Sequence, residues 1–339
     1  MPLILKRNIL EEILALTCNR TFQGRFVSGK HTPLSLLLLS ALIWAVGVLL
    51  LPFPMSVVYH AGQYSIQGWY VPAFVPPLCY VAIALMLGML NVHERRIRWL
   101  AAAFLLQIAV SVFLHYNAMA ALSSLLFAVA IAQLFNCQPG VGVEASLFAA
   151  FASLGIFSFL MPQFLYVLPL FVAYIPIANI SGIKRFLAAL LGMFMPFWFL
   201  FGAIYVWPAI ADAVPSSGSF LASIAFLEIA DITPLRLLLL AMELLIFLPA
   251  AMLFARSSVP GKPYLRKRLM FILIANAYLL SLSWLSGPNY DMFYSWRVPG
   301  CVLMLSYILS FKITKVSNIY FITVLVFWLA VAIVSIWMN

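Results

Sequence analysis

The chain has 339 residues, of which 65% are hydrophobic and only 8% carry a charge. A soluble protein of this length needs a larger polar surface, so the composition predicts an integral membrane protein. Backbone groups in hydrocarbon must be paired within the protein, which leaves a helix bundle or a β-barrel. The apolar runs are continuous for about 17–25 residues, which favours an all-α bundle of membrane-spanning helices.

The net charge of +10 could indicate nucleic-acid binding, but the basic residues lie beside apolar runs, where membrane topology explains them. We therefore expect no nucleic-acid partner. The sequence contains no phosphate-binding glycine loop, no HExxH and no GxSxG. The four histidines lie too far apart to indicate a local metal site, and no motif names a cofactor. The four cysteines form no CxxC and are expected to be packing residues.

Residues 1–33 form a basic segment with a short apolar stripe from Ile9 to Leu16. This pattern predicts an amphipathic helix on the cytoplasmic membrane surface. The first long apolar run begins only at Leu34, and no cleavage pattern follows, so the segment is not expected to be a signal peptide. The bundle is expected to occupy 34–339.

Eleven apolar runs predict eleven spans, at 34–52, 72–91, 97–115, 119–135, 145–160, 162–178, 186–208, 235–255, 269–286, 296–311 and 318–338. With the N-terminus in the cytoplasm, 17 of the 19 basic residues lie on the inner side. This bias supports the orientation and places the C-terminus outside. The runs 145–160 and 162–178 are short, and they could instead form a hairpin that does not fully cross.

Glu243 is the most informative single residue, because it lies near the middle of the 235–255 run. An ionised carboxylate there costs about 2.5–3.5 kcal/mol on insertion scales, so it should face protein or a water-filled cavity. It is either a structural group bonded to a neighbouring helix or a catalytic or transport residue. Arg236 lies on the same helical face, about 10 Å nearer the outside.

The predicted outer connection 209–234 contains a short apolar repeat that predicts an interfacial helix near 219–231. Glu228 and Asp231, three residues apart, point to one side of that helix. They form either a solvated polar end or a carboxylate pair that can act as a base or a cation ligand.

Four residues of the other predicted outer loops are not explained by an interfacial aromatic belt: His60, His115, Asp291 and Arg297. With Arg236 they would suit a sugar phosphate or a lipid headgroup, because guanidinium groups bind phosphate well. The alternative is local pairing of Arg297 with Asp291, and of Arg236 with Glu228 or Asp231.

A resemblance covers about 96–201 and rests on Ala132-Gln-Leu-Phe-Asn136, Leu147-Phe148, Leu154-Gly155, Pro162, Lys184-Arg-Phe186, Leu191-Gly192 and Pro196. In these residues the chain resembles a family of multi-pass membrane proteins from Bacteroidota, a domain of unknown function. The resemblance implies the inner membrane of a Gram-negative cell, and it brings no catalytic residues to transfer.

Three functional hypotheses follow. The first is an envelope enzyme that acts on a lipid-linked substrate at the periplasmic face; it looks loosely like the membrane-embedded glycosyltransferases that use polyprenyl-phosphate donors. Those enzymes usually carry an acidic residue in the first outer loop, whereas 53–70 contains none. The second is a transporter or flippase in which Glu243 binds protons. The third is a subunit of an envelope complex without chemistry of its own. Membrane lipids are the expected partners.

Overall fold

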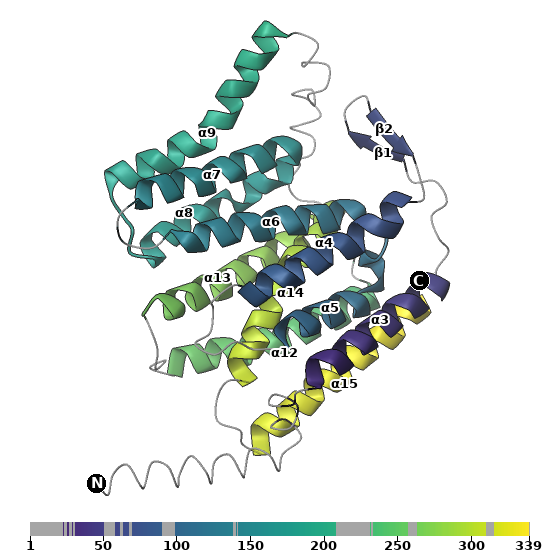
Figure 1. The fold of residues 1–339 in the computed structure, drawn as a ribbon. Helices are drawn as coiled ribbons and strands as arrows, with labels where there is room; N and C mark the ends of the chain where they lie inside the picture. The colour runs from purple at the N-terminus through teal and green to yellow at the C-terminus, as the bar shows by residue number, and fades with distance from the viewer. Residues whose placement is uncertain are drawn as a thin grey trace, which may run out of the picture.

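The structure is a computed structural model that describes residues 23, 26, 29, 31–50, 58–61, 64–67, 70–89, 99–137, 140, 142–207, 231, 233–256, 263–309 and 315–338. Apart from one hairpin, its regular elements are helices (Figure 1). The α-helices are α3 (Thr32–Leu50), α4 (Tyr70–Met89), α5 (Leu100–Val110), α6 (Ala118–Asn136), α7 (Val143–Leu160), α8 (Leu168–Ile177), α9 (Ile183–Val206), α12 (Pro234–Arg256), α13 (Pro263–Leu285), α14 (Tyr290–Leu309) and α15 (Lys315–Met338). The 3₁₀ turns are η1 (Val112–Leu114), η2 (Pro162–Val167) and η3 (Gly287–Asn289), and strands β1 (Val58–Ala61) and β2 (Tyr64–Gln67) pair antiparallel.

The helical, multi-pass character predicted from composition is confirmed. Within the described residues, nine helices are long and apolar enough to cross a membrane. The predicted runs 97–115 and 162–178 correspond to shorter helical segments, Leu100–Val110 and Pro162–Ile177. An 11-residue helix such as α5 is about 17 Å long, against about 30 Å of hydrocarbon.

The 97–115 run is interrupted at Ser111 and does not form one long helix. Ser111 leaves the helical conformation at ψ 72°, and its hydroxyl donates to the Gln107 carbonyl at 3.1 Å. A 3₁₀ turn and the His115 turn follow before α6 begins. The 162–178 run is interrupted in a similar way, because Pro162 opens η2 and Pro169 lies in the first turn of α8.

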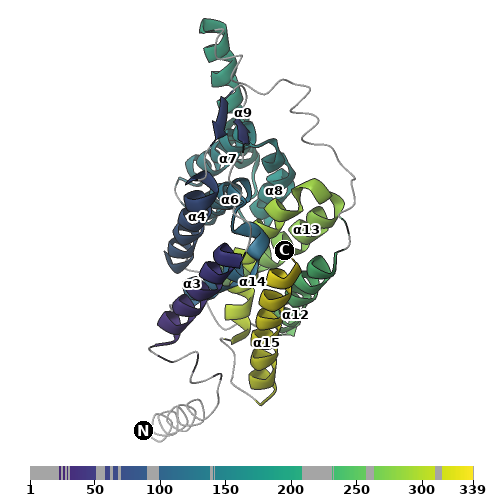
Figure 2. The same cartoon turned by 90° about the vertical axis from the view of Figure 1, so that its right-hand side faces the viewer.

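Helix α14 forms the centre of the molecule. It packs against α5, α6, α12 and α13, and Figures 1 and 2 both show it in the middle of the bundle. Of its apolar span, 89% is buried, the largest share among the described candidate spans. Its fully buried side chains include Tyr290, Tyr294, Trp296 and Arg297. A polar side chain on this helix is therefore held inside the protein and away from lipid.

By contrast, α9 lies at the edge and packs mainly on α7. Two glycines allow close approach: a Cβ added at Gly192 would collide with the Phe148 carbonyl oxygen, and one at Gly155 would lie 2.6 Å from that of Met193. The second half of α9 extends away from the other helices in both ribbon views (Figures 1 and 2).

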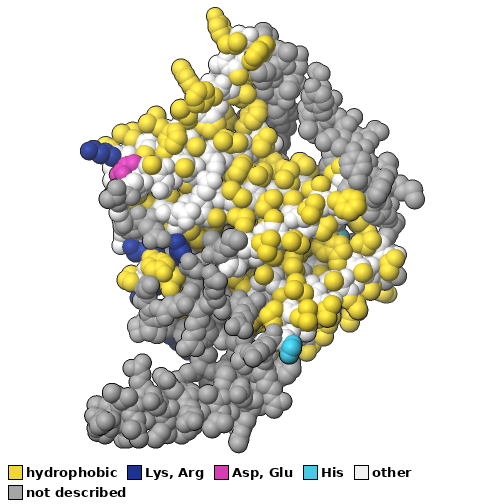
Figure 3. All heavy atoms as spheres, viewed as in Figure 1, with side chains coloured by type: hydrophobic (Ala, Val, Ile, Leu, Met, Phe, Trp, Pro, Cys, Tyr) yellow, Lys and Arg dark blue, Asp and Glu magenta, His cyan; other side chains and the backbone are white. Residues whose placement is uncertain are grey.

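The Lys and Arg side chains visible in Figure 3 gather at one edge of the molecule, which we call the basic end. There Arg268 donates to the Phe135 carbonyl in the last turn of α6 at 2.6 Å. Lys267 donates to the Ala178 carbonyl just after α8 at 3.0 Å. Arg185 pairs with Glu144 at 3.4 Å. Cations are favourable near the carbonyl ends of helices, so Arg268 and Lys267 cap the ends of α6 and α8. They also belong to the excess of basic residues predicted for the cytoplasmic side. We call the opposite end the outward end, after the predicted orientation.

Some predictions lie outside the described residues. They are the helix near 219–231 apart from Asp231, the residue Glu228, and most of the segment 1–33. The backbone of His60 is described, in β1 opposite Ser65, but its side chain is not.

Candidate functional site

A buried ion pair joins α12 to α14. Arg297 Nη1 donates to Glu243 Oε2 at 2.5 Å, and the two side chains are 2% and 5% exposed. The prediction that Glu243 faces protein is therefore confirmed. The predicted position of Arg297 in an outer loop is wrong, because α14 already begins at Tyr290 and carries Arg297 two turns into the bundle. Arg297 pairs with Glu243, and the alternative of an Arg297–Asp291 pair is also wrong.

This ion pair does not satisfy all the polar atoms that it buries. Glu243 Oε1 and Arg297 Nε have no hydrogen-bond partner among the described residues. The side-chain nitrogen and oxygen of Gln107 on α5 are also buried and have no hydrogen-bond partner among the described residues. Unpartnered buried polar atoms are costly and mark places where water or a polar ligand can bind.

A row of aromatic rings connects the pair to the outward end. The Arg297 guanidinium lies 5.4 Å from the centre of the Tyr294 ring. The Tyr294 ring stacks on that of Tyr290, with centroids 6.2 Å apart and planes 13° apart. The Arg236 guanidinium lies over the Tyr290 ring, 4.5 Å from its centroid. Two cations of α12 and α14 are thus linked through two tyrosines of α14, an arrangement in which each ring face attracts a cation.

Asp291 and its neighbours form a polar cluster at the outward end, to which α6 and α14 both contribute. The Asn117 amide donates to Asp291 Oδ2 at 3.3 Å, while its carbonyl oxygen accepts from the Ala120 N–H at 3.0 Å. Asn117 is therefore fixed as the N-cap of α6 and holds the Asp291 carboxylate in place. Beside them, Gln163 of η2 donates to the Asn289 side chain at 3.4 Å.

Tyr80 brings a third helix, α4, to this cluster. Its side chain is fully buried, and its hydroxyl has no hydrogen-bond partner in the described part of the chain. The Asp291 carboxylate lies within electrostatic range of this hydroxyl and also of Arg236. We call Tyr80, Asn117, Arg236, Tyr290 and Asp291 the outward cluster. It contains a cation, a carboxylate, an amide and two phenols. Asn117 and Asp291 lie at the starts of α6 and α14, whereas Tyr80 lies near the middle of the α4 span Val71–Gly88.

Among the described residues, Arg236 does not bond to the Asp231 carboxylate, and Glu228 lies outside the described residues. Its Nη1 donates to the backbone carbonyl of Asp231 at 3.1 Å, and its backbone N–H donates to Thr233 Oγ1 at 3.2 Å. No described carboxylate forms a salt bridge with it. The predicted pairing of Arg236 with the Asp231 side chain is therefore wrong for the described contacts. The half-buried guanidinium remains the cation best placed to meet an anion.

His115 lies inside the bundle. It is 1% exposed, its Nε2 is 2.9 Å from the Ala109 carbonyl, and its ring stacks on Trp44 at 4.0 Å between centroids. Gly47 of α3 leaves room for this ring, since an added Cβ would lie 2.8 Å from its Nδ1. His115 thus joins α3 to the turn before α6 and contributes packing; the expectation of an exposed loop position is wrong, and its contact with a ligand stays a prediction.

The structure brings together Arg236 and Asp291 in the outward cluster, with Arg297 and Glu243 deeper along the same helices. It adds Tyr80, Asn117, Tyr290 and Tyr294, which were not predicted as site residues. One sequence signal could have found part of this set: Tyr290, Tyr294, Arg297 and Cys301 recur at helical spacing and share one face of α14.

No protein-family model, curated protein or solved structure matches the chain. The site must therefore be interpreted from its own chemistry, and the resemblance to a Bacteroidota family stays a prediction.

Proposed function

We propose that this chain is an envelope protein that binds a lipid-linked sugar phosphate at the outward end of the bundle. The observation that carries the proposal is the convergence of Arg236, Asp291 and Asn117 from three helices: the Arg236 guanidinium lies 4.5 Å from the ring centre of Tyr290, the neighbour of Asp291, and Asn117 donates to Asp291 at 3.3 Å. Arg236 supplies a cation for a phosphate. Asp291, held by Asn117, accepts hydrogen bonds from sugar hydroxyls and is placed to act as a general base.

The proposal includes the topology. The N-terminus lies in the cytoplasm, the outward end faces the periplasm of a bacterial inner membrane, and all eleven apolar segments take part in crossing. The caps that Lys267 and Arg268 provide at the basic end support this orientation, because the excess of Lys and Arg marks the cytoplasmic side. Helix α5 returns the chain from the basic end, and neighbouring helices cover its short length.

A binding measurement with undecaprenyl phosphate tests the headgroup site in detergent-solubilised protein. The uncharged undecaprenol is the ligand control, and Arg185→Gln is the protein control, because it removes an exposed arginine at the opposite end. We expect Arg236→Gln to weaken phosphate binding about tenfold or more, which is about 1.4 kcal/mol. Equal binding of phosphate and alcohol, or an unchanged affinity in Arg236→Gln, would overturn the proposal.

A second candidate is a flippase for the same class of lipid. It is favoured by the buried Glu243–Arg297 pair, whose unpartnered polar atoms provide an intramembrane polar site. Proteoliposomes containing fluorescent undecaprenyl phosphate distinguish the two candidates. Protein-dependent movement of the probe between leaflets that is lost in Glu243→Gln supports the flippase, whereas binding without movement supports the first candidate.

A further inference from the structure

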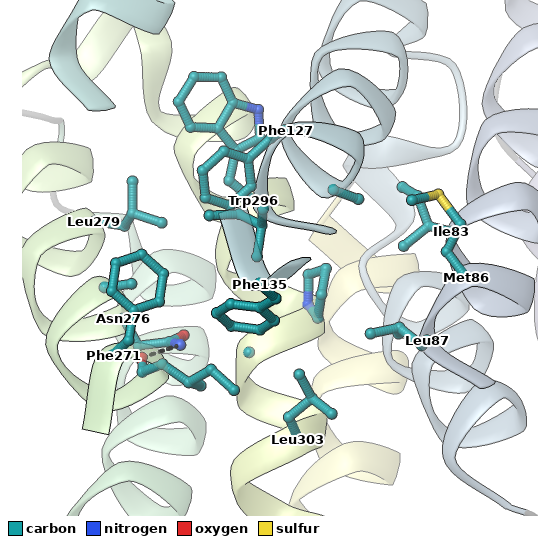
Figure 4. A pocket seen from close by; sticks show the side chains of 16 residues that line it. Ile83, Met86, Leu87, Phe127, Phe135, Phe271, Asn276, Leu279, Trp296 and Leu303 are labelled. Atoms are coloured by element: carbon teal, nitrogen blue, oxygen red, sulfur yellow. Dashed lines mark hydrogen bonds between the residues drawn. The ribbon is translucent and has the colours of Figure 1, made fainter. Parts of the chain in front are cut away.

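A cavity of about 60 Å³ lies between α4, α6, α13 and α14, partly open to the exterior of the bundle. Figure 4 shows the side chains that line it, with Phe127 and Trp296 at one end and Leu87 and Leu303 at the other. Every lining residue except Asn276 is apolar or a glycine. The walls therefore resemble the hydrocarbon that surrounds the protein.

The single polar residue of the wall is already bonded. The Asn276 amide donates to the Ile272 carbonyl at 2.8 Å, and its carbonyl oxygen accepts from Cys301 Sγ at 3.6 Å. Apolar cavities without free polar groups stay dry and take up apolar molecules, whereas a bound water needs two to four polar partners. The cavity is thus suited to hydrocarbon and not to water or a polar solute.

The cavity is aligned with the outward cluster along two helices. On α4, Tyr80 is followed by the lining residues Ile83 and Leu87, three and seven positions later. On α6, Asn117 is followed by Ala128 and Ile131, eleven and fourteen positions later. These spacings keep the residues on one face of each helix. On α4 the rise from Tyr80 to Ile83 is about 4.5 Å, so the cavity begins about one turn below Tyr80; on α6 the first lining residue, Phe127, lies about 15 Å below Asn117.

We propose that this cavity receives the end of a hydrocarbon chain of a bound lipid. The polar group that marks the upper limit of the site on α4 is the Tyr80 hydroxyl, which is fully buried and unpartnered among the described residues. A lipid with its headgroup at the cluster would run past Tyr80 and place apolar carbons below it. A cavity of about 60 Å³ holds a chain end and not a whole chain.

The headgroup part of this arrangement rests on the proposed function, but chain occupancy can be measured by itself. The probe is zwitterionic phosphatidylcholine with bromine near the ends of its acyl chains, because bromine quenches tryptophan only at short range. Trp296 lines the cavity and is 1% exposed, so lipid around the bundle cannot reach it. Its emission is obtained as the difference between the wild type and Trp296→Phe. Trp198, which is 77% exposed, gives the signal of ordinary lipid contact through Trp198→Phe.

We expect Trp296 emission to fall by about twofold or more in brominated vesicles relative to unbrominated ones. Ala128→Phe fills the cavity and should abolish this quenching, whereas Ala241→Phe, the same change at an exposed position of α12, should leave it intact. Quenching of Trp198 without quenching of Trp296 would overturn the proposal, as would quenching of Trp296 that Ala128→Phe leaves unchanged. If Ala128→Phe fails to fold, the wild-type comparison of Trp296 with Trp198 still decides.

The two proposals fail separately. If the protein binds undecaprenyl phosphate and undecaprenol equally well, the proposed phosphate site is wrong, but Trp296 should still be quenched by brominated phosphatidylcholine. If Trp296 is not quenched, the proposed chain site in the cavity is wrong, but the Arg236-dependent binding of phosphate should still be observed.

Discussion

Arg297 on α14 donates to Glu243 on α12, and each residue is the other's only ion-pair partner among the described residues. Removing one member of a buried ion pair leaves an uncompensated charge, which costs about 3–5 kcal/mol. We expect Glu243→Leu to lower thermal stability in detergent strongly. Glu243→Gln should keep the fold, because its amide oxygen can still accept from Arg297, and it should reduce activity if Glu243 is functional.

The double variant Glu243→Leu/Arg297→Met distinguishes pairing from general packing. Replacing both charges with apolar groups of similar volume is often neutral, so the double variant should recover most of the lost stability. Glu144→Gln provides the comparison, since it breaks the exposed Arg185 pair, which contributes about 0–1 kcal/mol. If the double variant unfolds as readily as Glu243→Leu, the two residues are not energetically coupled.

The contact between α7 and α9 depends on the small size of two glycines. An alanine Cβ at Gly192 meets the backbone of Phe148, which cannot rotate away, so we expect Gly192→Ala to destabilise the protein by about 1–3 kcal/mol. At Gly202 of the same helix an added Cβ has nothing within 4 Å. Gly202→Ala should therefore be neutral or slightly stabilising, because alanine favours the helix. Equal thermal stability of the two variants would contradict the close packing.

The packing of His115 against α3 can be tested by a double-mutant cycle. Gly47→Ala places a Cβ 2.8 Å from His115 Nδ1 and displaces the ring from its stack on Trp44. We expect this change to lower thermal stability in the wild type but to have little effect in a His115→Ala background. Additive losses would show that Gly47 acts independently of His115.

Membrane orientation can be measured by cysteine labelling in intact cells. Ser258→Cys lies in 256–268, which is predicted to face the cytoplasm, and Ser217→Cys lies in 209–234, which is predicted to face outward. The native Cys79, Cys137 and Cys301 are buried, and Cys18 is replaced by alanine to remove its signal. A membrane-impermeant maleimide should label Ser217→Cys alone. Labelling of both positions from the same side would show that the predicted span count is wrong.

The sequence alone determined that this protein is a helical membrane protein and where most of its helices lie. The reason is physical: hydrocarbon leaves a backbone no partner except itself, so a long apolar run must form a helix. The same constraint explains why Glu243 could be predicted to face protein. Its neighbours in the sequence cannot shield a carboxylate from lipid, and only other helices can.

Which helices do so was decided by the tertiary structure. The polar and aromatic composition of 287–297 predicts a loop, yet the rings of Tyr290, Phe293, Tyr294 and Trp296 and the Arg297 guanidinium are buried on α14. Their polar atoms find partners on other helices: Arg297 on α12, Tyr294 at Ser111 beside α5, and Asp291 on α6. Ser111 shows the opposite case, in which an apolar run is interrupted where a hydroxyl lies 2.9 Å from that of Tyr294 on α14. Local composition cannot distinguish these outcomes, because the partners that decide them lie more than fifty residues away along the chain and meet only in the folded bundle.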